Sequence, residues 1–184
     1  FQPVAFAPDG TLYVEANAGE DKSALHAFDI KTGKISSKPL IVSNEYDFSG
    51  QLIMGKDRLL GARLLTDGES TIWFDEQMKA VQKQVDERMP STINIVSVPT
   101  RAETPWVLVE SYSDVQPKVF HLFDTVAKTL TRLGDSRPGI VPAQMGTQDM
   151  VKYKARDGLD IPAWLTLPSG AKSTALPMVV LVHG

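Results

Sequence analysis

Cysteine is absent from this chain of 184 residues. Its absence excludes disulfide bridges, thiolate zinc sites and cysteine nucleophiles, but it does not distinguish the cytoplasm from the periplasm. Histidine is scarce, because the chain has only three, and none stands at the spacing of metal ligands. We therefore expect neither a metal ion nor a cofactor, and we leave the compartment open.

A long apolar run and a strong charge excess are also missing. No stretch approaches the roughly 20 apolar residues that span a bilayer. The 19 Lys and Arg residues nearly balance the 22 Asp and Glu residues, with a formal net charge of −3. This balance favours neither a nucleic acid nor a membrane as partner. With 42% hydrophobic residues, the composition is that of an ordinary folded domain.

Three copies of a short pattern are present in the first 130 residues. In each copy an apolar or aromatic strand candidate ends at a Phe-Asp pair, and a second strand candidate precedes it. The pairs are Phe28-Asp29, Phe74-Asp75 and Phe123-Asp124, followed by Lys34, Lys79 and Lys128. Their spacing of about 46 and about 49 residues is near the period of a four-stranded propeller blade. The alternative is that Phe-Asp recurs by chance in an unrelated all-β domain.

One segment departs from the strand pattern. Met78, Val81, Val85 and Met89 recur at steps of three and four residues, with polar residues between them. This spacing predicts an amphipathic helix over about 76–88, with Asp75 as N-cap and Pro90 as stop. A β-hairpin arm with an accidental helical period is the alternative.

The repeat predicts a mainly β fold for residues 1–147, namely about three C-terminal blades of a β-propeller. Propellers need four to eight blades to bury their lateral faces, so we expect further blades before Phe1. Exposed blade edges would make the chain prone to self-association.

The pattern changes near residue 148. Residues 150–168 predict two strands around the turn Asp157-Gly158, which is a β-hairpin. The apolar run from Met178 to Val182 has the composition of a strand buried on both faces of a parallel sheet. We expect 148–184 to be the first strands of a second domain that continues beyond this chain.

Residues 150–184 resemble the start of the catalytic domain in the prolyl oligopeptidase family of serine peptidases, especially its acylaminoacyl-peptidase and dipeptidyl-aminopeptidase branches. The resemblance rests on a strand, an Asp-Gly turn, the motif I-P-x-x-L-x-x-P at 161–168, and P-x-V-x-x-x-H-G at 177–184. It implies an α/β-hydrolase domain capped by a propeller that restricts access of short peptides to a Ser-His-Asp triad. The triad would lie beyond Gly184, so the chain itself is predicted to be inactive.

Only His183 and Gly184 match a functional motif of that family, as the start of the loop that helps to form the oxyanion hole. The resemblance assigns His183 no role as general base, and a plain strand-end histidine is an equal alternative. Glu110 and Arg137 are candidates to face a propeller channel. Trp73, Trp106 and Trp164 all lie in strand candidates, where we expect them in the core.

Two serines mimic a nucleophile elbow, which reads G-x-S-x-G between a strand and a helix. Ser136 is followed by Pro138 in the last glycine position, and Ser70 by Ile72, so we reject both. His26 and His121 stand at equivalent places of the repeat, which favours packing over catalysis. The serine peptidase has two rivals: an esterase of the same fold, and a non-catalytic propeller that serves as an interaction module.

Overall fold

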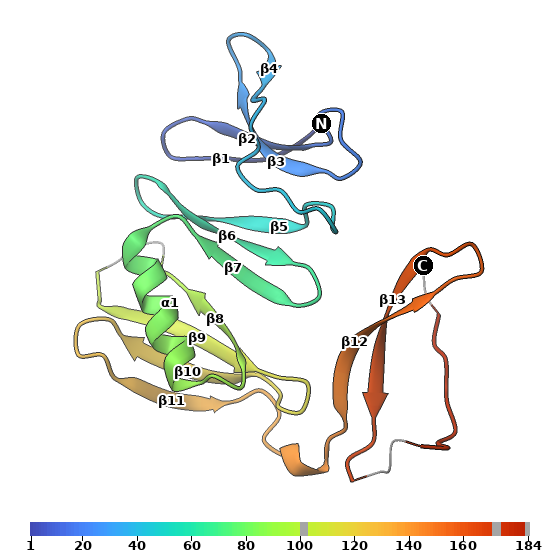
Figure 1. Cartoon of the computed structure of the whole chain (residues 1–184). Helices are drawn as coiled ribbons and strands as arrows, with labels where there is room; N and C mark the ends of the chain where they lie inside the picture. Colours follow the sequence, from blue (N-terminus) through green and yellow to red (C-terminus); the bar gives the residue numbers. More distant parts are fainter. Residues whose placement is uncertain (100–102, 171–173, 183–184) are drawn as a thin grey trace.

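The structure is a computed structural model that describes residues 1–99, 103–170 and 174–182. It consists almost entirely of antiparallel strands, with one α-helix. Three sheets follow one another along the chain, and a separate two-stranded hairpin comes last (Figure 1). The described part contains no helix that is long and apolar enough to cross a membrane.

The strands of each sheet pair in sequence order. Sheet A contains β1 (Gln2–Phe6), β2 (Leu12–Ala16), β3 (Ala24–Asp29) and β4 (Lys34–Ile35). Sheet B contains β5 (Gly50–Met54), β6 (Leu59–Leu65) and β7 (Glu69–Trp73). Sheet C contains β8 (Ile93–Ser97), β9 (Trp106–Tyr112), β10 (Val119–Asp124) and β11 (Leu130–Asp135). The 3-10 turn η1 (Pro142–Gln144) leads to the hairpin of β12 (Thr147–Lys154) and β13 (Asp160–Leu167).

The Phe-Asp pairs hold equivalent places, because each lies at the end of the third strand of its sheet. In all three, the aspartate Oδ1 accepts backbone N–H groups of the residues that follow. Asp29 accepts from Lys31 and Thr32, Asp124 accepts from Val126 and Ala127, and Asp75 accepts from Met78. The pKa of each carboxyl is held below its ordinary value. The largest cause is the side-chain hydrogen bond from Thr32 for Asp29 and from Arg58 for Asp75, with the backbone N–H groups next among the lowering causes. For Asp124 the backbone N–H groups come first.

The path of the backbone after each aspartate depends on the fourth residue that follows it. In all three copies this residue donates its N–H to the aspartate C=O, at 2.8, 3.0 and 2.9 Å in chain order. Gly33 and Lys128 have positive φ values of 67° and 59°, so the chain turns back and forms β4 or β11. Lys79 occupies the same place in the second copy, but there the chain continues as helix α1 (Glu76–Arg88).

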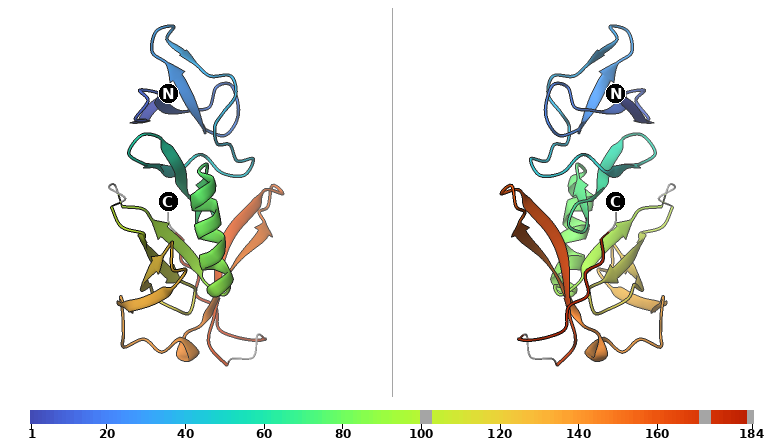
Figure 2. Two further views of the ribbon diagram at one scale, coloured as in Figure 1. Left: turned by 90° about the vertical axis from the view of Figure 1, so that its left-hand side faces the viewer. Right: turned by 90° about the vertical axis from the view of Figure 1, so that its right-hand side faces the viewer.

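The predicted helix is confirmed, which excludes the hairpin-arm alternative. Met78, Val81 and Val85 are its buried residues, and Asp75 is its N-cap. These side chains join the main core with Leu60 and Trp73 of sheet B. Sheet C completes that core, most deeply with Val96, Val109 and Phe123. Helix α1 thus lies against one flank of the stack and is shared by two sheets (Figure 2).

A second apolar cluster joins sheets A and B. Leu25 of β3 and Ala62 of β6 are fully buried there, together with Ile41 and Phe48 from the segment that links the sheets. Gly61 shows how tight the packing within sheet B is, because a Cβ at this position would collide with the backbone of β7 beside Trp73. The three sheets therefore stack face to face through two cores.

The predicted hairpin at 150–168 is also confirmed, with Met150 opposite Trp164 in the register. Its turn contains Gly158 at φ 88°, and Asp157 Oδ1 accepts the N–H of Leu159 at 3.1 Å. The first turn of the chain repeats this geometry, since Asp9 Oδ1 accepts the N–H of Thr11 at 2.9 Å. The Asp-Gly turns that the sequence indicated are thus formed at both ends.

Two sequence predictions fail in the described residues. The apolar segment from Met178 to Val182 forms no strand, and Val179 is 94% exposed. A buried parallel strand needs hydrogen-bonded neighbours on both sides, and the described part of the chain supplies none. Trp106 and Trp164 are about half exposed, so only Trp73 is a core tryptophan. Each of the exposed pair lies in a strand of which one face is open.

Substitution of Asp75 tests the helix start. Asp75→Ala removes the acceptor for Met78 N–H and should lower the free energy of unfolding by about 1 kcal/mol. Asp75→Asn keeps a side-chain acceptor for the N–H of Met78 and loses only the oxygen that accepts from the exposed Arg58, a loss that the alanine variant shares, so it should cost clearly less. Denaturant unfolding followed by circular dichroism measures both. Equal losses in the two variants would contradict the capping role.

Candidate functional site

The sequence-predicted site residues His183 and Gly184 lie outside the described residues. The geometry of the predicted oxyanion loop therefore stays a prediction. The polar side chains that the described residues bring together lie elsewhere, at the end of sheet C where the chain leaves toward the β12–β13 hairpin.

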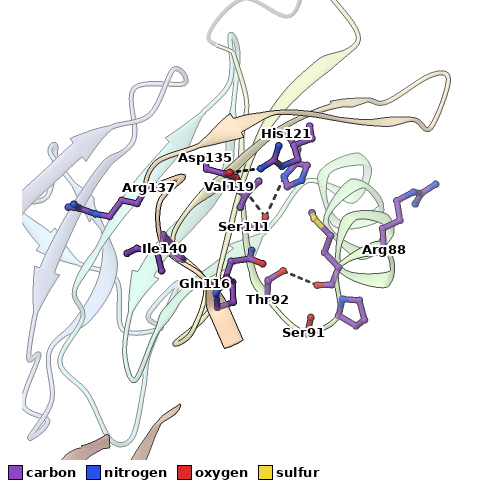
Figure 3. A pocket seen from close by; sticks show the side chains of 15 residues that line it. Arg88, Ser91, Thr92, Ser111, Gln116, Val119, His121, Asp135, Arg137 and Ile140 are labelled. Carbon is purple, nitrogen blue, oxygen red and sulfur yellow. Dashed lines mark hydrogen bonds and ion pairs between the residues drawn. The ribbon is translucent and has the colours of Figure 1, made fainter. Parts of the chain in front are cut away.

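A cavity of about 460 Å³ lies at this end of sheet C, between the C-terminus of α1 and the segment that follows β11. Strands β9, β10 and β11 supply its polar wall. Its lining includes Ser111, Gln116, His121, Arg132 and Asp135, with Arg88 and Arg137 among the remaining residues. Figure 3 shows Arg88 and Arg137 extending away from Ser111 and His121, in opposite directions.

A serine, a histidine and an aspartate meet in this cavity. Ser111 Oγ lies 3.4 Å from His121 Nδ1 and at the same distance from the backbone C=O of Val119 (Figure 3). Asp135 forms a close ion pair with Arg132, and its Oδ1 is buried without a hydrogen-bond partner among the described residues. Burial, and then the positive charge of Arg132, lower the pKa of His121 below its usual value.

This trio does not have the geometry of a catalytic triad. Ser111 is 1% exposed and lies within strand β9, whereas a nucleophilic serine projects from a sharp strand-to-helix turn. The imidazole offers Nδ1 to the serine, although Nδ1 is the atom that a triad aspartate orients. Asp135 is held by Arg132 instead. We therefore assign these side chains to the packing of sheet C.

A second polar cluster joins sheet C to sheet B nearby. Tyr112 donates its hydroxyl to Glu69 Oε2 at 2.7 Å, across the two sheets. Lys118 Nζ donates to Glu110 Oε2 at 2.8 Å and lies 5.6 Å from the centre of the Tyr112 ring. Burial and the Glu69 carboxylate raise the pKa of Tyr112, and the hydrogen bond to Glu110 raises the pKa of Lys118. Tyr112 therefore stays neutral and Lys118 stays charged at neutral pH.

The other residues that the sequence suggested as candidates lie in packed, paired or exposed positions of the sheets. His26 is 3% exposed, and its Nδ1 lies 2.8 Å from the backbone oxygen of Ser36. Glu110 is paired with Lys118, so it offers no free carboxylate. Ser136 and Ser70 are exposed and lie at the end of β11 and within β7, which are not nucleophile elbows. No group of three metal-ligating side chains occurs in the residues that the structure describes.

Sequence reasoning missed both clusters. Ser111, Asp135 and Arg132 come together through the strand register of sheet C, in which a bulge shifts the pairing between Phe120 and His121. The contact of Glu69 with Tyr112 depends on how two sheets stack. The alternation of apolar and polar residues along a single strand predicts neither the register of sheet C nor the stacking of sheets B and C.

The partly buried His121 predicts a pH dependence of stability. Its pKa is lowered in the folded state, so protonation favours the unfolded chain as the pH falls below the ordinary value of about 6.5. His121→Gln removes the titrating group. Between about pH 7.5 and about pH 5.5, the wild type should lose more stability than this variant. Melting temperatures across this interval measure the difference, and parallel curves would contradict the assignment.

No family model matches the chain. A curated relative, dipeptidyl aminopeptidase BIII from Pseudoxanthomonas mexicana, is 27% identical over 194 aligned residues. The alignment covers 99% of this chain and 27% of the relative, so the chain spans about a quarter of the length of the protein it matches. This similarity supports a link between the chain and the peptidases whose motifs residues 150–184 resemble.

Proposed function

We propose that this chain is part of a serine peptidase of the prolyl oligopeptidase family, which removes residues from short peptides. The observation that carries the proposal is the similarity to a dipeptidyl aminopeptidase along 99% of the chain. The motif at 161–168 agrees with it, because these residues match the pattern at the start of the family's catalytic domain.

In this proposal the three stacked sheets are consecutive blades of a β-propeller. Sheets A and C have four strands each in sequence order, as propeller blades do, and α1 follows the third strand of sheet B. The propeller would limit the size of peptides that reach the active site. Residues 1–147 would be this gate, and 148–184 the start of the hydrolase domain.

The proposed chemistry is acyl transfer through a Ser-His-Asp triad that lies outside residues 1–184. Ser111 and His121 do not supply it, for the geometric reasons given above. His183 and Gly184 would precede the oxyanion loop, where backbone N–H groups stabilise the negative charge on the carbonyl oxygen. No metal or cofactor takes part in such a reaction.

Hydrophobic contact between the hairpin and the proposed hydrolase domain is expected from the exposed side chains. Tyr153, Leu159 and Trp164 of the hairpin are each more than half exposed. Only a few polar contacts bind the hairpin to the sheets, among them the backbone N–H of Gln148 to Asp114 Oδ2 at 2.9 Å. We infer that the hairpin packs mainly against the proposed hydrolase domain.

A fluorophosphonate probe, which reacts with activated serines, tests the proposed location of the nucleophile. The complete protein should be labelled and should release chromophore from dipeptidyl substrates in preference to simple esters. Residues 1–184 alone should remain unlabelled. In the complete protein, Ser136→Ala should leave labelling and turnover unchanged, since this serine has no part in the proposed triad.

Labelling of the isolated chain would overturn the proposed location of the triad. A complete protein that is folded but neither labelled nor active would support the non-catalytic propeller instead. Turnover of esters without turnover of peptides would favour the esterase.

A further inference from the structure

The outer edge of sheet B is open. Sheets A and C end in a fourth strand, but sheet B ends at β7, because the chain forms α1 after Asp75. The N–H of Phe74 donates to the C=O of Leu60 in β6. Since alternate residues of a strand direct their backbone groups to the same side, Thr71 and Trp73 direct theirs away from β6.

The outer edges of the other two sheets are protected against pairing. Strand β4 has only two residues. Strand β11 has a bulge in its register and carries the charged Arg132 in its middle. Short edge strands, bulges and charges are the features that prevent edge-to-edge association. The second half of β7 reads Thr71-Ile72-Trp73 and has neither a bulge nor a charge.

Helix α1 does not close this edge. An open groove of about 710 Å³ lies between β7 and one face of the helix. Its lining comprises Thr71, Trp73, Lys79, Gln82, Lys83, Asp86, Glu87 and Pro90. Trp73 Nε1 donates to Gln82 Oε1 at 3.1 Å at the bottom of this groove. The groove thus combines an unpaired strand edge with a charged helical wall.

The charges on that wall are arranged by sign. Lys79 and Lys83 belong to the first half of the lining helix face, and Asp86 and Glu87 belong to the second half. A two-fold axis that pairs two such walls antiparallel brings each lysine half opposite an acidic half. The groove is therefore complementary to a second copy of itself, whereas a partner of one charge sign would match only half of it.

We propose that β7 is a dimerisation edge, at which a second copy of this chain pairs its own β7 antiparallel across a two-fold axis. The pairing would join two copies of sheet B into one six-stranded sheet. It satisfies the outward backbone groups of Thr71 and Trp73, which is the usual source of affinity in strand addition. This inference is independent of the proposed peptidase activity.

The axis passes at Thr71, the middle residue of the five in β7. In this register Thr71 faces Thr71 of the other copy, and Ser70 faces Ile72. Thr71 Oγ1 is buried and has no hydrogen-bond partner among the described residues. The pairing therefore rests on the outward backbone groups of Thr71 and Trp73, because Oγ1 is enclosed by the chain itself.

Disulfide trapping in the complete protein tests the register. Residues 1–184 contain no cysteine, so Thr71→Cys introduces the single thiol of this part of the protein, and the complete protein without the substitution is the control for thiols elsewhere. Under mild oxidation, Thr71→Cys should give a covalent dimer, because the two Cβ atoms lie opposite each other across the axis. Ser70→Cys is the matched control on the same strand, and it should give far less dimer because it faces Ile72. Equal trapping at both positions, or none at Thr71→Cys, would overturn the proposal.

Charge reversal tests the helical wall without changing β7. The double variant Lys79→Glu/Lys83→Glu should weaken self-association roughly tenfold, since each reversal acts twice about the axis. Adding Asp86→Lys/Glu87→Lys restores the complementary pattern and should restore association. Sedimentation equilibrium measures both, with circular dichroism to verify the helix. A monomeric wild-type protein at micromolar concentration, or a four-fold variant that stays as weak as the double, would overturn the proposal.

Discussion

The arrangement of the three sheets depends on one interaction that occurs three times, the hydrogen bonds that an aspartate carboxylate accepts from the backbone that follows it. At the end of the third strand in each sheet, an aspartate accepts the backbone N–H groups that would otherwise be left free as the chain changes direction. The same acceptor serves a tight turn after Asp29 and Asp124, and a helix after Asp75. The next few residues decide between the turn and the helix. After Asp29 and Asp124, positive φ values at Gly33 and Lys128 end the turn. In the second copy, buried apolar residues at helical spacing continue it as α1.

The helix that results binds two sheets into one unit. Its apolar face fills the space between sheets B and C, and a chain of hydrogen bonds crosses the same space. Trp73 Nε1 donates to Gln82 Oε1, and Gln82 Nε2 donates to the backbone oxygen of Asn94 in β8, at 3.1 and 2.9 Å. One helical side chain thus connects the last strand of one sheet to the first strand of the next. The unpaired edge of β7 is the cost of this arrangement, because no fourth strand covers it.

Local patterns in the sequence were enough to predict part of this structure. The helix was predictable with its N-cap because capping and the spacing of apolar residues act within a few residues, and the hairpin was predictable from its Asp-Gly turn. The first strand of each sheet could not be predicted, because its sequence shows no clear alternation of apolar and polar residues. These strands are Gln2–Phe6, Gly50–Met54 and Ile93–Ser97. The Ser111 and His121 contact depends on register, and that of Glu69 with Tyr112 on sheet stacking. Met178 to Val182 has the composition of a buried strand, but burial requires neighbours that this segment does not have.

The outer position of each sheet has a consequence for engineering. It holds a two-residue strand after β3, a helix after β7 and a six-residue strand after β10, while the inner three strands keep the same order. After β3 this position tolerates exchange, because β4 belongs to neither buried cluster, whereas α1 supplies Met78, Val81 and Val85 to the main core. A longer outer segment can therefore replace residues 30–35, or a binding peptide can be inserted among them, without redesign of the inner strands. In the second copy the same position holds a helix of 13 residues.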